Sequence, residues 1–175
     1  MNANRLQAAA EAVLFAAGEP LELTKLSAVL GLDDEQTEQV LENLAAQLDE
    51  RGSGIALLKL NDKYQLATRA EFSAEVREAL EVKRNTPLSP AAFEVLAVIA
   101  YNQPVTKSFI ESVRGTDSSS VVNKLVERGL VAEAGRLEIP GRPIAYKTTE
   151  LFLRSFGMKS LDELPPLESR QDKGL

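Results

Sequence analysis

The fold of this chain is decided by residues 51–68, RGSGIALLKLNDKYQLAT, because the hydrophobic period changes within them from about 3.6 residues to about 2. The turn RGSG separates the two periods. After it, apolar and polar side chains alternate on either side of an Asn61-Asp62 turn; the positions on one face are Ile55, Leu57, Tyr64, Leu66 and Thr68. Alternation around a two-residue turn predicts a β-hairpin.

Helical spacing surrounds this hairpin on both sides. Three amphipathic helices are predicted before it, and a further helix over residues 71–80 is predicted after it. The three are residues 5–17, which end at Gly18; residues 21–30, which end at Gly31; and a helix capped by Asp33 or Asp34, whose apolar stripe is Val40, Leu41, Leu44 and Leu48. Three helices followed by a hairpin is the plan of a winged-helix domain.

The same plan recurs in the second half of the chain. Its predicted elements are a helix from Ser89-Pro90 to Tyr101, a helix over residues 104–115, a helix capped by Thr116 or Asp117 that stops at Gly129, the hairpin IPGRPIAYK at residues 139–147, and a short helix over residues 151–156. At an offset of 84 residues, Gly31 falls on Gly115 and Phe15 falls on Ile99. This correspondence indicates internal duplication.

The predicted fold class is therefore mainly α with small β-hairpins (α+β), arranged as tandem winged-helix domains. The predicted boundaries are an N-terminal domain over residues 1–80, a linker over residues 81–88 that holds two prolines, a C-terminal domain over residues 89–164 and a disordered polar tail over residues 165–175. A three-helix fold with an unrelated hairpin is the alternative.

Composition excludes several classes of function. The 175 residues contain no Cys and no His, so thiolate chemistry, disulfides and the commonest general base and metal ligand are all absent. Charge is uneven, with 7 basic and 14 acidic side chains in residues 1–80 against 13 and 12 in residues 81–175. The N-terminal stretch carries Arg5 and Glu11 at helical spacing, so neither a signal peptide nor a membrane span is expected, and we expect a soluble intracellular protein.

Several motifs resemble those of a known family. They are RGTDSS at residues 114–119, PGRP at residues 140–143 and SLDELPPL at residues 160–167, together with EAVLFAAGEPLELTKLSAVLG in the first half. With these pieces the chain resembles the bacterial segregation and condensation protein B (ScpB) family over about residues 3–167. Lys63 and Thr116 depart from the residues that this family often has at those positions, Gly and Val.

The resemblance implies a tandem winged-helix protein that forms a homodimer largely through its first domain. It also implies that the dimer binds the kleisin subunit ScpA, which closes the ring of the SMC ATPase in bacterial condensin. The family has no catalytic residues and no cofactor, so none is expected here. The implied location is the cytoplasm, on the nucleoid through the SMC complex, and DNA contact is expected to be weak or indirect.

Two surfaces are candidates for partner binding. The third helix of the first domain exposes Asp34, Glu35, Glu38 and Glu42, which are unsuited to DNA phosphates and indicate either a solvated face or a dock for a basic partner. In the second domain we predict contact residues at the end of the second helix, on the third helix and in the wing. A purely structural role is the alternative for the residues that cap the third helix and for those of the hairpin. These predicted residues are Arg114, Ser118, Ser119, Asn123, Arg142 and Tyr146.

The leading hypothesis is a non-enzymatic adaptor that binds the kleisin as a homodimer and supports chromosome condensation and segregation. The alternative is a dimeric winged-helix transcriptional regulator that reads DNA with its second domains. Against it stand the acidic total of 26 Asp and Glu to 20 Lys and Arg and the weak positive charge of Lys124 and Arg128 on the predicted reading helix. A phosphate-binding loop, a nucleophile elbow and EF-hand spacing are absent from the sequence.

Overall fold

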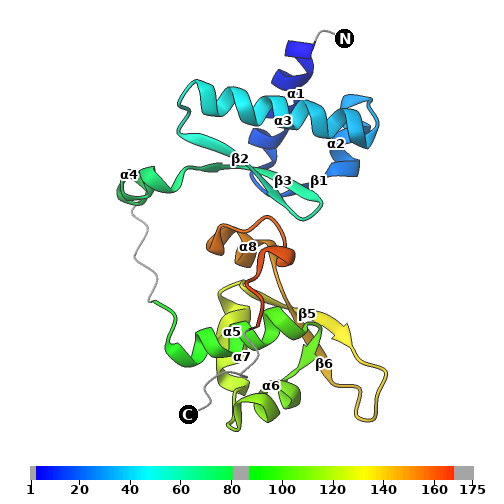
Figure 1. Ribbon diagram of the computed structural model, residues 1–175, viewed down its shortest axis with the longest axis vertical. Coiled ribbons are helices and arrows are strands. Elements are labelled where there is room, and N and C mark those ends of the chain that lie inside the picture. Colours follow the sequence, from blue (N-terminus) through cyan, green and yellow to red (C-terminus); the bar gives the residue numbers. More distant parts are fainter. Residues whose placement is uncertain (1–2, 81–86, 168–175) are drawn as a thin grey trace, which may run out of the picture. The chain divides into compact units, whose positions relative to one another are not determined.

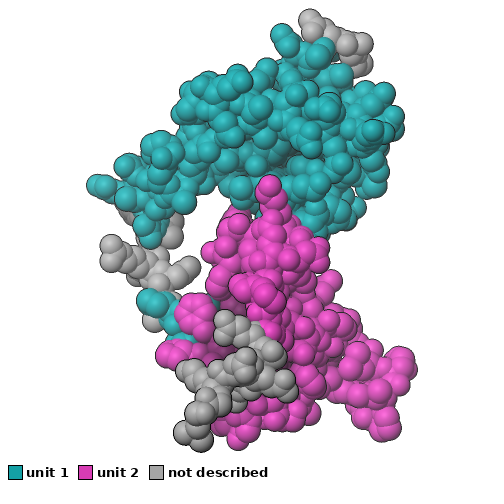
Figure 2. Space-filling model, in the orientation of Figure 1, with its two compact units in different colours: residues 1–89 teal, residues 90–175 magenta. Residues whose placement is uncertain are grey.

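The computed structural model describes residues 3–80 and 87–167 and divides the chain into two compact units, residues 1–89 and residues 90–175. Figure 2 colours the two units separately. Most of the predicted linker, residues 81–86, lies outside the described residues, as do residues 168–175 of the predicted tail. The first tail residue, Pro165, is described, and its carbonyl accepts a hydrogen bond of 2.6 Å from the Tyr101 hydroxyl.

Unit 1 is a three-helix layer with a small sheet packed against it (Figure 1). Its elements are α1 (Ala3–Ala17), β1 (Leu21–Glu22), α2 (Leu23–Leu30), α3 (Asp34–Glu50), β2 (Ile55–Leu60), β3 (Lys63–Thr68), the 3-10 turn η1 (Ala70–Phe72) and α4 (Ser73–Ala79). The antiparallel sheet has the order β1-β3-β2. The core lies between α1, α2, α3 and the sheet, and its centre is formed by Ala10, Leu14, Leu26, Leu41, Leu44 and Leu48.

Unit 2 repeats this architecture. Its elements are α5 (Pro90–Asn102), β4 (Val105–Thr106), α6 (Lys107–Arg114), α7 (Ser119–Glu127), β5 (Val131–Arg136), β6 (Ile144–Thr148), α8 (Glu150–Phe156) and the 3-10 turn η2 (Leu161–Glu163). The antiparallel sheet has the order β4-β6-β5, which matches the order in unit 1. The prediction of tandem winged-helix domains in a mainly α chain is therefore confirmed.

The duplication holds in detail over the second helices. Gly31 and Gly115 both end their helices in the left-handed conformation, with φ of 68° and 70°, where glycine avoids a Cβ clash. Their N–H groups donate to Ser27 O and Glu111 O, two acceptors that are also 84 residues apart. Over the first helices the offset is 85 instead, because the fully buried Ile99 takes the place of Leu14 in the core and Phe15 is exposed. The predicted match of Phe15 to Ile99 is therefore wrong by one residue.

Two predicted boundaries are also corrected by the structure. Residues 21–30 and 104–115 do not form helices throughout, because each segment starts with a two-residue strand, β1 or β4, that pairs with the wing. The first strand of the second wing is β5 rather than a segment that includes Ile139. Gly135, at a φ of 91°, lies at a register shift in β5 between Glu133 and Arg136, so the strand lacks regular alternation.

The predicted cap of α7 at Thr116 or Asp117 is wrong, because Ser118 is the N-cap residue, and Asp117 Oδ1 instead accepts a hydrogen bond from Ser119 N at 2.9 Å.

The predicted turns of both wings and the predicted cap of α3 are confirmed. Asn61 takes a positive φ of 57° in the first wing, and Asp33 caps α3 by accepting a hydrogen bond from Gln36 N at 2.7 Å. In the second wing Gly141 has a φ of 85°, and the N–H of Arg142 donates to Ile139 O at 2.9 Å. Pro at the second position and Gly at the third are the residues that a type II turn favours.

Candidate functional site

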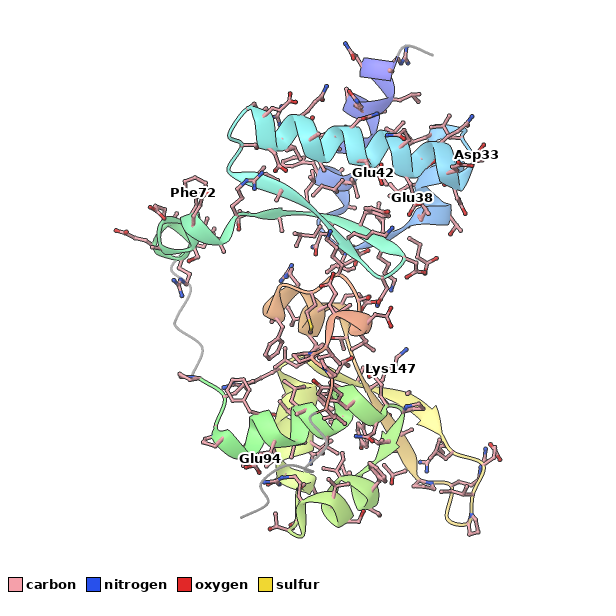
Figure 3. All side chains as sticks on the ribbon, viewed as in Figure 1. Asp33, Glu38, Glu42, Phe72, Glu94 and Lys147 are labelled. Carbon is pink, nitrogen blue, oxygen red and sulfur yellow. The ribbon has the colours of Figure 1, made fainter. Side chains whose placement is uncertain are left out.

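The acidic α3 of unit 1 is the first candidate surface, and its carboxylates differ in their hydrogen bonds and exposure (Figure 3). Asp33 caps the helix, and Asp34 accepts a hydrogen bond of 2.6 Å from the Ser27 hydroxyl, which ties α3 to α2. Both lie at the N-terminus of α3, where negative charge stabilises the helix dipole. Glu35 and Glu42 are exposed, so they are the carboxylates of this surface that a partner can reach most directly.

Glu38 joins α3 to the first wing. Its Oε1 accepts hydrogen bonds from Lys59 Nζ at 2.7 Å and from the Tyr64 hydroxyl at 2.9 Å. Lys59 Nζ also lies 5.6 Å from the centre of the Tyr64 ring, a cation–π distance. These hydrogen bonds lower the pKa of Glu38 and raise that of Lys59, while burial raises the pKa of Tyr64. Glu38 is therefore half-buried and charge-paired, rather than free on the surface as the sequence predicts.

Arg114, Ser118 and Ser119 are brought together in unit 2 by one polar network. Arg114 Nη2 lies 2.9 Å from Glu94 Oε2, and Arg114 Nη1 donates to the Ser118 hydroxyl at 2.6 Å. Glu111 Oε1 accepts from the Ser118 N–H at 3.3 Å and from the Ser119 hydroxyl at 3.1 Å. The network ties α5, α6 and α7 to one another.

Burial limits which members of this network a partner can touch. Ser118 has 0% relative exposure, and the Arg114 side chain retains only 10%. Ser118 therefore offers no surface in this conformation, and both residues have partners inside the unit. The sequence 116–120 is polar throughout, so it carries no signal that distinguishes the buried Ser118 from its exposed neighbours.

Asn123 and Tyr146 lie on either side of a lysine that sequence reasoning missed. Lys107 Nζ donates to Asn123 Oδ1 at 2.8 Å and lies 5.6 Å from the centre of the Tyr146 ring. Tyr146 is buried, whereas Asn123 is exposed. Tyr64 and Tyr146 hold equivalent places, because Tyr64 pairs with Leu21 of β1 and Tyr146 pairs with Val105 of β4.

Each wing tyrosine carries a lysine over its ring, but the two lysines come from different elements, Lys59 from β2 and Lys107 from the start of α6. The two sites differ in charge, because Lys59 is neutralised by Glu38 whereas Lys107 faces the neutral amide of Asn123. Lys107 therefore has an amide rather than a carboxylate as its hydrogen-bond partner, while Glu133 lies opposite Tyr146 across the sheet.

Arg142 stands apart at the tip of the second wing. Its guanidinium is exposed and pairs with Glu138 Oε1 at 2.6 Å, and its backbone carbonyl accepts from Arg136 Nη1 at 2.9 Å. Its φ of 39° is unusual for a residue with a Cβ, and a hydrogen bond from its own N–H to Ile139 closes the turn that produces it. An exposed arginine on a well-defined turn is available to a partner, but at a cost of breaking its pair with Glu138.

The described residues offer no cluster of three His, Cys, Asp or Glu side chains that suits a metal ion. Among the same residues, no helix is both long and apolar enough to cross a bilayer. An apolar pocket of about 390 Å³ lies in unit 2 between α5 and the segment from α8 to Pro165. Phe93, Phe152 and Phe156 line it, with Glu163 as its charged member.

Comparisons with known proteins identify the family. A family model described as segregation and condensation complex subunit ScpB matches residues 8–167. The chain is 40% identical over 168 residues to segregation and condensation protein B of Ruminiclostridium cellulolyticum, covering 96% of this chain and 88% of that protein.

Two solved structures are also similar to the chain. ScpB from Mycobacterium tuberculosis is 34% identical, with 90% of this chain and 98% of that chain covered and a TM-score of 0.45. A dimer of an ScpB N-terminal domain complexed with an ScpA peptide is 31% identical, with 43% and 95% covered and a TM-score of 0.42. From the family model and the sequence identity, this chain belongs to the ScpB family of segregation and condensation complex subunits.

Proposed function

We propose that this chain is a non-enzymatic adaptor that binds the kleisin subunit of a bacterial SMC complex as a homodimer and thereby supports chromosome condensation and segregation. Membership of the ScpB family over residues 8–167 is the observation that carries the proposal. The proposed location follows from the partner: the cytoplasm, on the nucleoid through the SMC complex. Catalysis has no part in the proposal, because the chain contains no His and no Cys.

The surface charge of unit 1 supports a protein partner over DNA. A winged-helix protein that reads DNA places its third helix in the major groove and neutralises phosphates with Lys and Arg. Here α3 carries acidic residues through its first turn and exposes Glu42 in its middle. A kleisin segment rich in Lys or Arg is complementary to this helix, whereas a phosphate backbone is repelled.

For unit 2 we propose that the partner contacts the wing and the exposed edge of α7. Asn123, Ser119 and Arg142 are the members of the predicted set that keep accessible surface. Arg114, Ser118 and Tyr146 act beneath that surface, because Arg114 and Ser118 hold α6 and α7 in register and Tyr146 lies under Lys107. We also propose that residues 1–80 form the dimerisation domain and that residues 89–164 form the partner-binding domain.

Titration of a purified kleisin fragment into the chain tests the proposal, with fluorescence anisotropy as the readout. We expect a dissociation constant of about 1 μM or tighter. Arg142→Glu is expected to weaken binding about tenfold if the wing tip contacts the partner, because it places a carboxylate beside Glu138. Lys159→Glu is the matched control, since Lys159 is an exposed cation of the same unit outside the wing.

Fluorescence anisotropy also distinguishes the proposed adaptor from the alternative, a transcriptional regulator. When duplex DNA replaces the kleisin fragment, we expect weak binding at physiological salt. Tight binding whose logarithm falls steeply with the logarithm of salt concentration would instead favour a DNA reader. An absence of kleisin binding at micromolar concentrations would contradict the proposed adaptor function.

A further inference from the structure

The apolar pocket of unit 2 is rich in aromatic side chains. It has a volume of about 390 Å³, within the range of about 300–1,000 Å³ that is usual for ligand sites. The chain contains six Phe, three Tyr and no Trp, and four of these nine residues line this pocket: Phe93, Tyr101, Phe152 and Phe156. None of the four belongs to the contact set proposed above for the kleisin, so the pocket is a separate surface of unit 2.

The pocket has a buried base and an open rim. Leu96, Ala100 and Phe152 line it and are buried. Phe93 and Phe156 remain 49% and 44% exposed, and their rings meet edge to face with centres 6.5 Å apart. A side chain that enters from solvent can therefore reach two aromatic rings at once.

The segment that follows α8 closes one side of the pocket and offers a ligand acceptors rather than donors. The backbone N–H groups of Met158, Glu163 and Leu164 already donate to carbonyls of unit 2. Pro165 has no N–H, and its carbonyl accepts the proton of the Tyr101 hydroxyl at 2.6 Å. The polar atoms of this segment that remain for a ligand are carbonyl and carboxylate oxygens, which require a donor.

Glu163 gives the pocket a negative charge. No Lys or Arg is among the described residues that line the pocket. The Glu163 side chain is exposed, and its Oε2 accepts a hydrogen bond of 2.9 Å from the Lys159 N–H. Within the described part of the chain it forms no ion pair. A carboxylate beside aromatic rings favours a cation, because the faces of the rings are negative as well.

We infer that this pocket binds an arginine side chain carried by a peptide segment of a partner protein. The apolar stem of an arginine packs against rings such as Phe93 and Phe156, and its planar guanidinium stacks on aromatic faces. Its five N–H donors suit a site of acceptors and can pair with both carboxylate oxygens of Glu163. Lysine fits less well, because its ammonium is compact, strongly hydrated and has no planar face. The inference goes beyond the proposed function, because it assigns a second binding site outside the wing and α7.

A peptide titration of the full chain tests the inference. The probe is the synthetic peptide acetyl-Gly-Leu-Arg-Leu-Gly-amide, and its control has citrulline in place of arginine, which keeps the shape and removes the charge. The readout is the backbone amide signals of Ala97, Tyr101 and Phe156 in ¹⁵N–¹H correlation spectra. We expect the arginine peptide to shift all three with a dissociation constant of about 1 mM or tighter. The citrulline peptide should bind about fivefold more weakly.

Two variants locate the cation and the stem. Glu163→Gln should weaken the arginine peptide about fivefold and change the citrulline peptide by less than about twofold, which isolates the charge pair. Glu127→Gln, at an exposed acid of α7, is the matched control and should leave both constants unchanged. Ala97→Leu fills the rim of the pocket and should weaken both peptides about tenfold. Its control is Ala134→Leu, at an exposed alanine of β5, and circular dichroism checks that both variants remain folded.

Each contrary result has a distinct meaning. Equal affinities of the two peptides for the unmodified chain, or undiminished binding of the arginine peptide to Glu163→Gln, would overturn the arginine site. Unshifted signals with both peptides at millimolar concentrations would overturn it as well. If Arg170→Gln shifts the three signals before any peptide is added, the arginine belongs to this chain, and the partner is overturned. None of these measurements uses the kleisin, so a failure here leaves the proposed adaptor intact.

Discussion

At the scale of single residues, the structure separates side chains that look alike in the sequence. Glu38 and Glu42 both read as exposed acids of one helix, but Glu38 is held by Lys59 and Tyr64 and Glu42 is exposed. Ser118 and Ser120 both read as polar residues of a helix start, but Ser118 is fully buried. The hydrogen-bond partners that bury or pair these residues lie in other elements. Glu38 is held by residues 21 or more positions further along the chain, and Ser118 is held by Arg114 of the neighbouring helix α6.

Gln7 carries a prediction about stability. Its Oε1 is buried and has no hydrogen-bond partner within the part of the chain that the structure describes. Its counterpart in unit 2, at the offset of 85, is the apolar Ala92. Because Gln7→Met keeps the shape and removes an unsatisfied acceptor, we expect it to raise the free energy of unfolding by about 1 kcal/mol.

Urea unfolding followed by circular dichroism measures the effect. Gln39→Met is the control, because Gln39 is exposed on α3 and its replacement should change the unfolding free energy by less than about 0.5 kcal/mol. A destabilised Gln7→Met protein would show that the Gln7 amide is satisfied in solution.

At the scale of elements, the polar network between α5, α6 and α7 determines how the second unit holds its third helix. Ser118→Ala removes the acceptor for Arg114 Nη1 and leaves one donor of a nearly buried guanidinium unpaired. We expect a loss of about 1–2 kcal/mol in unfolding free energy. The measurement is thermal or urea unfolding of the variant beside Ser120→Ala, whose exposed hydroxyl should be worth less than about 0.5 kcal/mol. Equal stabilities of the two variants would contradict this role of the network.

Helices and the first wing could be predicted from sequence because their residues repeat with a clear period. The strands β1 and β4 could not, since two residues carry no period, and both sit where apolar residues extend the helical pattern that follows. Strand β5 could not be predicted for another reason. Its sequence, VAEAGR, consists of small and charged residues without a clear apolar alternation, and its register shifts between Glu133 and Arg136.

The candidate site could be predicted less well than the fold. Arg142 at the second wing tip is exposed, in line with an available contact residue, but the pairing of Lys107 with Tyr146 and Asn123 depends on the sheet order β4-β6-β5. That order follows from the unpredicted strand β4, so no pattern within the second half alone identifies Lys107. Comparison of the two wings does not identify it either, because the lysine over Tyr64 comes from β2 whereas Lys107 comes from the start of α6.

At the scale of the whole molecule, the two units share one fold but differ in charge and in cover. The first half is strongly acidic and the second is nearly neutral. The first helix of unit 1 exposes Phe15, whereas the equivalent face of α5 in unit 2 is partly covered by α8 and the segment to Pro165. The difference in charge is compatible with the adaptor proposed above, because the two units offer different surfaces to a partner chain.

The molar mass of the chain, measured by light scattering with and without a purified kleisin fragment, tests the adaptor most directly. The account predicts twice the chain mass for the protein alone and, with the fragment added, a discrete larger species that contains two copies of this chain and bound kleisin. A mass that stays unchanged on addition of the fragment at micromolar concentrations would contradict the account.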